Sequence, residues 1–274
     1  MTSIAIDLGG TNLRVARIEN GVIASQVSEP CKADGTKEEV IEHICQLIDC
    51  VKTDDCSRIG MAVPSVVDYE HGIIYNVQNI PSWDEVHLKD ICEKQFGIET
   101  RIDNDVNCFV WGEKTLGEGK PYRSIVGITL GTGVGAGIVI DGKLHRGANT
   151  GAGEIGCLPY LESDYEHYTS SQFFKLHGTT GADEAKKMAE GDEHAKELWE
   201  EFGFHLGKLL QVILFAYDPE CIIIGGGISA SAPLFEQAMK QSMHDNFPYP
   251  HEAENVKIVF SKLKDCNLLG ASQL

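Results

Sequence analysis

Apolar and polar positions alternate in blocks that predict strands and helices in turn along the whole chain. Short apolar runs predict buried strands at residues 3–7, 12–18, 22–27 and 58–63. Asn20-Gly21 lies between the second and third of these runs, and this pair favours a tight hairpin turn. Between residues 37 and 51 the apolar side chains recur with helical spacing, which predicts a helix with one buried face. The chain is therefore expected to open with antiparallel strands and to continue through a β-α-β crossover.

The same alternation continues into the second half of the chain without a low-complexity linker. Helices are predicted at residues 85–96, 106–116 and 197–217. Strands are predicted at residues 125–130, 136–140 and 221–224, and Gly225-Gly226-Gly227 ends the last of them. This order is typical of an α/β protein, and the length of 274 residues favours two lobes over one large domain.

The charge balance narrows the classes of partner. The chain has 41 Asp and Glu residues against 23 Lys and Arg residues, which gives a formal net charge of −18. Such a surface repels a phosphate backbone and an anionic bilayer. Binding to nucleic acid or to a membrane is therefore not expected, whereas a local loop of backbone amides with Mg²⁺ could still bind ATP.

The sequence shows no signal for export or for membrane insertion. It has no run of eighteen apolar residues and no basic start followed by a long apolar stretch, so a cytoplasmic location is expected. Nine cysteines are scattered without a Cys-x-x-Cys pair. This pattern argues against a disulfide framework or a local zinc cage, and reduced thiols are expected.

A glycine-rich motif occurs twice. Residues 6–11 (IDLGGT) and 128–133 (ITLGTG) superpose, and each leads through a hydrophobic strand to an Asx-Gly turn. Glycines at the end of a buried strand let backbone N–H groups approach a phosphate, and Thr11 or Thr132 could add a hydroxyl donor. Neither turn matches a P-loop or a dinucleotide-binding motif. The repeat suggests a duplicated lobe with two phosphate-binding hairpins, although two structural turns could recur by chance.

A second candidate for chemistry is the segment 101–107 (RIDNDVN), at a predicted strand-to-helix junction. It combines carboxylates and amides within a few residues. Asn104 or Asp105 could cap the helix, because such side chains satisfy the free N–H groups of a first turn. A carboxylate here could instead accept a proton from an attacking hydroxyl. The residues alone leave both interpretations open.

Five ordered motifs resemble those of the ROK sugar kinases. They are DLGGTNLR at 7–14, NDVNCFVWGE at 104–113, LGTGVGAGIVIDGKLHRG at 130–147, GAGEIG at 151–156 and IIIGGGIS at 222–229. The resemblance implies a two-lobed α/β fold of the actin-like, hexokinase-like (ribonuclease H-like) ATPase class, with a mixed sheet flanked by helices in each lobe. It also implies an N-terminal lobe at 1–113 with the first phosphate motif and the catalytic Asp, and a C-terminal lobe at 114–274, whose final residues could pack on the first lobe.

The resemblance also implies roles for individual residues. Asp105 matches the catalytic base. The sugar-binding positions correspond to Asn79, Asn104, Asp105, Glu154 and Glu166. The ATP-binding positions correspond to Asp7, Gly9, Gly10, Thr11, Gly131, Thr132, Gly133, Gly225, Gly226 and Gly227. Mg²⁺ would accompany ATP near Asp7, through water.

One motif departs from the family pattern. Cys157 stands where the family usually has a histidine after Glu-Ile-Gly, and no cysteine follows until Cys221. Because a tetrahedral zinc site needs four donors, no structural zinc is expected. The family histidine normally also contacts the sugar, so the replacement leaves sugar selectivity open.

The resemblance implies an ATP-dependent hexose kinase that phosphorylates a sugar hydroxyl, most simply at C6, with glucose as first candidate and N-acetylmannosamine or another hexose as alternatives. A homodimer is implied by resemblance only. Two further classes stay open: a non-catalytic sugar-responsive regulator and an ATPase with a different substrate. The family's repressors have an N-terminal DNA-binding domain. A first strand at residue 3 and the acidic charge argue against a repressor.

Overall fold

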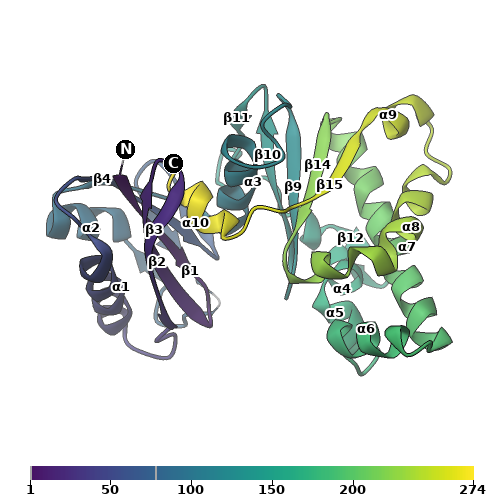
Figure 1. Ribbon diagram of the computed structural model, residues 1–274, viewed down its shortest axis with the longest axis horizontal. Helices are drawn as coiled ribbons and strands as arrows, with labels where there is room; N and C mark the ends of the chain where they lie inside the picture. The colour runs from purple at the N-terminus through teal and green to yellow at the C-terminus, as the bar shows by residue number, and fades with distance from the viewer. Residues whose placement is uncertain (1, 78) are drawn as a thin grey trace. The chain divides into compact units, whose positions relative to one another are not determined.

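The computed structural model describes residues 2–77 and 79–274 and is a mixed α/β protein (Figure 1). Its contacts divide the chain into two compact units. Unit 1 comprises the residues up to Lys120 together with Lys143–Ala152 and Leu263–Leu274; unit 2 comprises Pro121–Gly142 and Gly153–Lys262. The domain division expected from the sequence, 1–113 and 114–274, stays a prediction, because units defined by contacts are not by themselves independently folding domains.

Unit 1 is built on a five-stranded sheet in the order β3-β2-β1-β4-β8. The strands are β1 (Thr2–Leu8), β2 (Asn12–Glu19), β3 (Val22–Pro30), β4 (Cys56–Val63) and β8 (Glu99–Asn104). The first three are antiparallel neighbours, whereas β1, β4 and β8 run parallel to one another. The predicted opening hairpins and crossover are confirmed.

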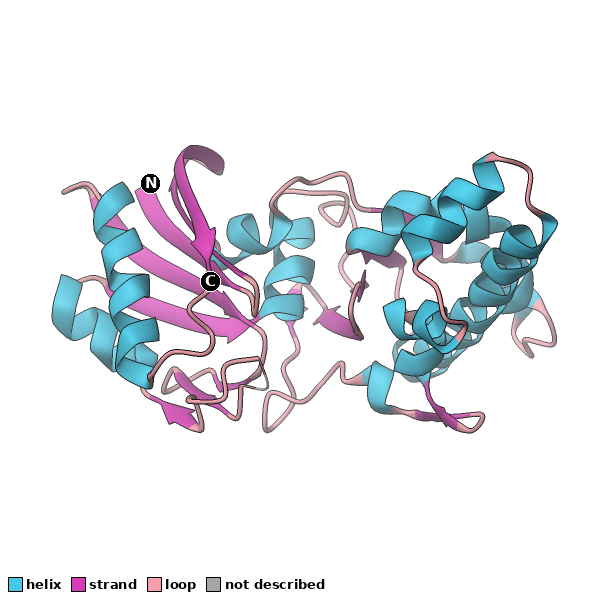
Figure 2. Cartoon of the chain, turned by 90° about the horizontal axis from the view of Figure 1, so that it is seen from below, coloured by secondary structure: helices cyan, strands magenta, loops and turns pink. Residues whose placement is uncertain are grey.

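The helices of unit 1 cover both faces of this sheet. They are α1 (Lys37–Val51), α2 (Leu88–Phe96), α3 (Asp105–Thr115) and α10 (Cys266–Ala271). Figure 1 shows α1 and α2 on one side and α3 and α10 on the other, and Figure 2 shows the strands as one twisted sheet. The α1 helix matches its predicted range because Thr36 and Glu39 form a capping box at its start.

The predicted helix at 85–96 is wrong over its first residues. Glu85–Val86 forms strand β7, which joins β5 (Val66–Asp68) and β6 (Ile73–Tyr75) in a small sheet. Val86 pairs with Ile74, so the helix α2 begins only at Leu88. Pairing with the nearby strand β6, and not the local apolar pattern, decides between strand and helix here.

The side of the sheet under α3 and α10 is lined by small residues. Ala5, Ala16 and Ala62 are buried there beside α10 residues such as Leu268. Two glycines allow close approach here, because a Cβ at Gly270 would lie 1.8 Å from the carbonyl oxygen of Cys108 on α3, and a Cβ at Gly60 would lie 1.8 Å from that of Ala271 on α10. The last helix (yellow in Figure 1) thus lies beside the first strands (purple) and completes the core of unit 1.

Unit 2 contains a second sheet, in which its strands have the order β10-β9-β14-β15. They are β9 (Ile125–Leu130), β10 (Val134–Ile140), β14 (Cys221–Gly225) and β15 (Lys257–Phe260). β9 and β10 form an antiparallel hairpin, while β9, β14 and β15 are parallel. The strands predicted at 125–130, 136–140 and 221–224 are confirmed with small shifts of their ends.

Most of the helices of unit 2 follow β10. They are α4 (Tyr165–Thr169), α5 (Ser171–Leu176), α6 (Gly181–Ala189), α7 (Glu193–Tyr217), α8 (Ala232–His244) and α9 (Pro250–Asn255). The short elements are β11 (Lys143–Leu144, in unit 1), η1 (Ile155–Cys157), β12 (Pro159–Tyr160), β13 (Ser163–Asp164) and η2 (Gly227–Ser231). Helices α7 and α8 pack closely, because a Cβ at Gly207 would lie 2.4 Å from the carbonyl oxygen of Met239.

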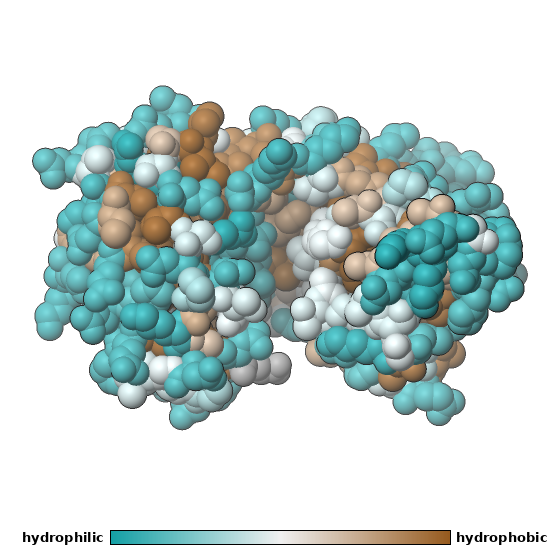
Figure 3. Space-filling model, turned by 60° about the horizontal axis from the view of Figure 1, so that its bottom comes forward, coloured by the Kyte–Doolittle hydropathy of each residue, from teal (hydrophilic) through white to brown (hydrophobic). Residues whose placement is uncertain are grey.

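The surface carries many polar side chains. The face shown in Figure 3 is mostly hydrophilic. Among the described residues, no helix has both the length and the apolar character needed to span a membrane.

Candidate active site

The predicted site residues of unit 1 gather at one edge of its sheet. β1, β4 and β8 are parallel, so their carboxyl ends lie at the same edge, where ligands of open α/β sheets bind. The register places Asp7, Ala62 and Asp103 in one row across these strands. The turn Gly9–Thr11 follows β1, and Asn104 ends β8.

Asp7 is part of a charged cluster at this edge. Arg14, directly opposite on β2, donates from Nε and Nη2 to Oδ2 of Asp7, and its Nη1 lies 2.7 Å from Oδ1 of Asp265. The second carboxylate leaves the cluster with a net negative charge. Both hydrogen bonds from Arg14 to the side chain of Asp7 use Oδ2. Its Oδ1 is an oxygen donor of the kind that Mg²⁺ prefers, and it is suited to bind a water molecule of the hydrated ion.

The first glycine turn lies against Asn79. Gly9 N–H donates to the carbonyl of Asn12 at 2.9 Å, which closes the turn. A Cβ at Gly10 would lie 2.6 Å from the Cβ of Asn79, so this position needs a glycine. Asn79 and Thr11 are both exposed. The structure therefore brings the predicted sugar-binding Asn79 next to the predicted phosphate turn.

The sequence left open whether Asn104 or Asp105 caps helix α3, and the junction between β8 and α3 shows the cap. Asn104 is the N-cap of α3, because its Oδ1 accepts hydrogen bonds from the N–H groups of Val106 at 2.8 Å and Asn107 at 3.3 Å. Its Nδ2 donates to the carbonyl of Ser65 at 3.3 Å. Asp105 is the first residue of the helix and is half-buried. The capping interpretation therefore applies to Asn104, although Oδ1 of Asp105 also accepts the N–H of Val106, at 2.9 Å. The role of Asp105 as a proton acceptor stays a prediction.

The pKa of the Cys108 thiol is influenced by several carboxylates around it. Cys108 is fully buried on α3, and its pKa is raised first by burial and then by the negative charges of Asp103, Asp105 and Asp7. These carboxylates come from different strands and from the helix, yet all act on one thiol. Asp7 and Asp105 consequently lie in the same neighbourhood of unit 1.

The two glycine motifs of unit 2 meet at the carboxyl ends of β9 and β14. The register pairs Gly225 with Thr129, and Gly131–Gly133 follows β9 directly. Gly226 has a φ of 84°, and a Cβ there would lie 2.3 Å from the carbonyl oxygen of Leu130. A side chain at residue 226 would separate the two turns, so glycine allows the predicted phosphate and adenosine motifs to pack together.

Glu166 lies beside the turn of the second hairpin. Its Oε2 accepts the N–H of Val134 at 3.2 Å, and a Cβ at Gly133 would lie 2.3 Å from that oxygen. The pKa of Glu154 is raised, first because neighbouring protein atoms displace water from its carboxylate and second because Glu166 is negatively charged, even though Glu154 keeps an exposed surface. The two predicted sugar-binding glutamates are therefore close enough to influence each other.

Cys157 belongs to the same acidic group. Its side chain is exposed, and its pKa is raised by partial burial and then by the charges of Glu154, Glu166 and Asp164. The raised pKa keeps the thiol protonated at neutral pH, so Cys157 presents a weak S–H donor beside the two glutamates.

Sequence reasoning missed Arg14 as a functional neighbour, together with Asp265. A signal for the first existed, because Asp7 and Arg14 are equally spaced from the turn of a predicted hairpin and so oppose each other. No local signal could have identified Asp265, which contacts Arg14 from near the far end of the chain.

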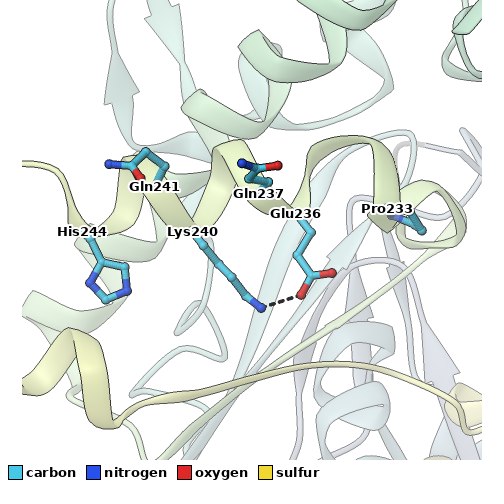
Figure 4. A pocket seen from close by; sticks show the side chains of 6 residues that line it. All are labelled: Pro233, Glu236, Gln237, Lys240, Gln241 and His244. Atoms are coloured by element: carbon cyan, nitrogen blue, oxygen red, sulfur yellow. Dashed lines mark hydrogen bonds and ion pairs between the residues drawn. The ribbon is translucent and has the colours of Figure 1, made fainter.

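Other hollows lie away from these residues. One runs along an exposed face of α8, where it is lined by Pro233, Glu236, Gln237, Lys240, Gln241 and His244 (Figure 4). Its charges are largely paired, since Lys240 lies 2.6 Å from Glu236. It contains none of the predicted site residues, and it is not part of the candidate active site.

The zinc prediction can be tested directly. Within residues 2–77 and 79–274, no group of three or more His, Cys, Asp and Glu side chains is placed to hold a metal ion. We expect the purified protein to contain well under one zinc ion per chain, and a zinc chelator to leave its melting temperature unchanged. Elemental analysis and thermal melts give the answer; stoichiometric zinc would contradict the assignment of Cys157.

Comparisons with known proteins identify relatives of this chain. The glucokinase of Thermotoga maritima is 29% identical, over 99% of this chain and 96% of its own length. A ROK family glucokinase from Streptomyces griseus, solved with glucose and AMPPNP, has a TM-score of 0.83 at 24% identity and covers 100% of this chain and 98% of its own.

Another solved structure, a putative N-acetylmannosamine kinase (Lmo2764) from Listeria monocytogenes, has a TM-score of 0.85 at 26% identity and covers 100% of this chain and 98% of its own. These likenesses confirm the expected α/β fold of the actin-like, hexokinase-like class. The sequence profile described as ROK family matches residues 3–167 and 161–274. The chain therefore belongs to the ROK family.

Proposed function

We propose that this ATP-dependent sugar kinase transfers the γ-phosphate of ATP to the C6 hydroxyl of a hexose, with glucose as the first candidate. The observation that carries the proposal is the edge of the unit 1 sheet. Neighbouring strands and loops carry three groups there: a glycine turn able to bind phosphate, the half-buried carboxylate of Asp105 and the amide of Asn79. The similarity to a glucokinase over nearly the whole chain supports the choice of sugar.

In this proposal Asp105 acts as the general base. Phosphoryl transfer requires mainly positioning and charge stabilisation, and a carboxylate within reach of the attacking hydroxyl can accept its proton. Asp105 lies at the start of α3, where Asn104 caps the helix and fixes the local backbone. The N–H of Val106 donates to Oδ1 of Asp105 at 2.9 Å, and this hydrogen bond helps to orient the carboxylate.

The nucleotide would be bound by backbone groups of the glycine turns. Residues 9–11 and 131–133 would bind phosphates, while 225–227 would allow adenosine to lie close to the main chain. Mg²⁺, when bound with ATP, neutralises phosphate charge. Asp7 would hold this ion through water, and the ion pair with Arg14 keeps the carboxylate of Asp7 at the sheet edge.

The sugar would be held by the remaining predicted residues. Asn79 and Asn104 offer amide groups, and Glu154 and Glu166 offer carboxylates, at the positions that match the family's sugar-binding residues. Glu154 has a pKa raised by burial and by the charge of Glu166, and its carboxylate would accept a hydrogen bond from a sugar hydroxyl. N-acetylmannosamine stays an alternative substrate, supported by the likeness to the Listeria structure.

We expect the release of ADP to depend on sugar when the protein is assayed with Mg²⁺ and ATP against glucose, mannose, allose and N-acetylmannosamine. Glucose is expected to give the highest kcat/KM. Removal of Mg²⁺ should stop turnover. A protein that binds a sugar without releasing ADP would be a regulator, and one that releases ADP equally without sugar would be an ATPase of another kind; either result would contradict the proposal.

The same panel tests the role of Cys157. Because a thiol is a weaker donor than an imidazole, the wild type is expected to discriminate poorly at the hydroxyl that this side chain faces. Cys157→His should sharpen the ratios of kcat/KM among the epimers by roughly 10-fold, the size expected when one polar contact is restored. If both proteins show the same sharp preference, Cys157 lies outside the sugar site.

A further inference from the structure

The carboxylate that precedes the catalytic segment is buried and fully engaged. The side chain of Asp103 is 0% exposed. Its Oδ1 accepts hydrogen bonds from the backbone N–H of Asn104 and from Nδ2 of Asn107, both at 2.8 Å. Its Oδ2 accepts from Nε of Arg146 at 2.6 Å. Asp103 therefore ties the end of β8 to the first turn of α3.

Arg146 compensates the charge of this buried group. It lies in the segment after β11, and its guanidinium carbon is 3.5 Å from the ring centroid of Tyr69. The hydroxyl of Tyr69 accepts from Nη1 of Arg101 at 3.3 Å. The guanidinium of Arg146 thus contacts a carboxylate and an aromatic ring, so its orientation is fixed.

Opposing effects act on the buried carboxylate of Asp103, so its charged form depends on Arg146. Burial raises the pKa of Asp103, while the positive charge of Arg146 and the hydrogen bond from Asn107 act in the opposite direction. Without the arginine, a carboxylate shielded from water takes up a proton or turns out of its site. In either case the hydrogen bond from the N–H of Asn104 to Asp103 is weakened. The backbone that orients Asp105 is then held less firmly.

We propose that Arg146 is a positioning residue for phosphoryl transfer, which acts through Asp103 on the backbone that presents Asp105. The inference rests on the proposed function, since it assumes that Asp105 is the base. The connection is a chain of hydrogen bonds: Arg146 holds Asp103, Asp103 holds the N–H of Asn104, and the side chain of Asn104 caps α3. A shift of the base by about 1 Å can cost roughly 100-fold in rate.

The test compares Arg146→Met with Arg101→Met. Both arginines contact Tyr69, and a hydrogen bond joins Arg146, but not Arg101, to Asp103. Arg146→Met is expected to lower kcat by about 10- to 100-fold while the KM for sugar and for ATP changes by less than about 3-fold. Arg146→Lys should recover part of the rate, because it keeps the charge. Arg101→Met should retain wild-type kcat.

Further variants separate positioning from stability. Asp103→Asn should lower kcat as Arg146→Met does, and the double variant should be no slower than Arg146→Met alone, because the two residues act as one unit. If Arg146→Met does not fold, Arg146→Lys and Asp103→Asn supply the same comparison. An unchanged kcat, or a raised KM for sugar with an unchanged kcat, would overturn the inference, the latter because it indicates direct contact with the substrate.

Hydrogen exchange provides a readout that does not depend on activity. Arg146→Met should raise the exchange rates of the amides of residues 104–107 without changing those of α1. Unchanged exchange rates at residues 104–107 would be enough to overturn the inference that Arg146 positions this backbone. A wild-type protein that releases no ADP with any sugar would overturn the proposed function instead, so the two failures are distinguishable.

Discussion

Asp105→Asn is expected to lower the kcat of sugar-dependent ADP release by at least about 100-fold, the usual contribution of a positioned general base. The substitution keeps the shape of the side chain and removes its basicity. Oδ1 of Asp105 accepts the N–H of Val106 at 2.9 Å, and the carbonyl oxygen of asparagine can accept the same hydrogen bond. The helix α3 should therefore form normally, and the loss should appear in kcat.

The measurement is a steady-state assay combined with calorimetry of sugar and ATP binding. Both ligands should bind to Asp105→Asn with affinities close to those of the wild type. Asp90→Asn is the matched control, because Asp90 lies in the first turn of α2 as Asp105 lies in the first turn of α3. The control should keep full activity. If Asp105→Asn also turns over at nearly the wild-type rate, Asp105 is not the base.

Local sequence patterns are sufficient to predict a helix or strand where neighbouring residues alone determine its structure. The helix at 37–51 starts at a capping box formed by Thr36 and Glu39, and the strand at 125–130 is an apolar run with one polar residue, Thr129. The glycine turns were also recognisable, since each ends such a run. The same signals failed at 85–86, where the partner strand β6 and not the local pattern decided the structure.

Contacts between distant segments could not be predicted in this way. Arg14 bridges Asp7 and Asp265, and Arg146 reaches Asp103 across a gap of more than forty residues. Charged residues of these types occur throughout an acidic chain, so no local pattern distinguishes the paired ones. The resemblance implies which residues bind sugar and ATP, whereas the structure shows the contacts that hold these residues in place.

Gly133 illustrates the difference between the two sources. The sequence places it in a phosphate-binding turn, where glycine lets the backbone approach a ligand. Its backbone φ lies outside the left-handed region. The structure gives another reason for glycine, because the space that a Cβ would fill is taken by the carboxylate of Glu166. The second phosphate turn and a predicted sugar-binding residue are therefore sterically linked.

Gly133→Ala is accordingly expected to weaken sugar binding. The new Cβ would lie 2.3 Å from Oε2 of Glu166, and this carboxylate is the flexible end of its side chain, so it should move while the fold stays intact. Displacement breaks its hydrogen bond with the N–H of Val134 and removes the carboxylate from the sugar. We expect the Kd for sugar to rise by about 10-fold, which corresponds to about 1.4 kcal/mol.

Calorimetry with sugar alone and thermal melts test this expectation. Gly151→Ala is the matched control, because a Cβ there meets nothing within 4 Å and the residue needs no positive φ; its Kd for sugar should be unchanged. Glu166→Gln should weaken sugar binding as Gly133→Ala does, and the double variant should lose little more than either single one, since both remove the same contact. A wild-type Kd for sugar in Gly133→Ala would show that Glu166 does not bind the sugar from this position, and equal losses of sugar affinity and melting temperature would indicate a folding defect instead.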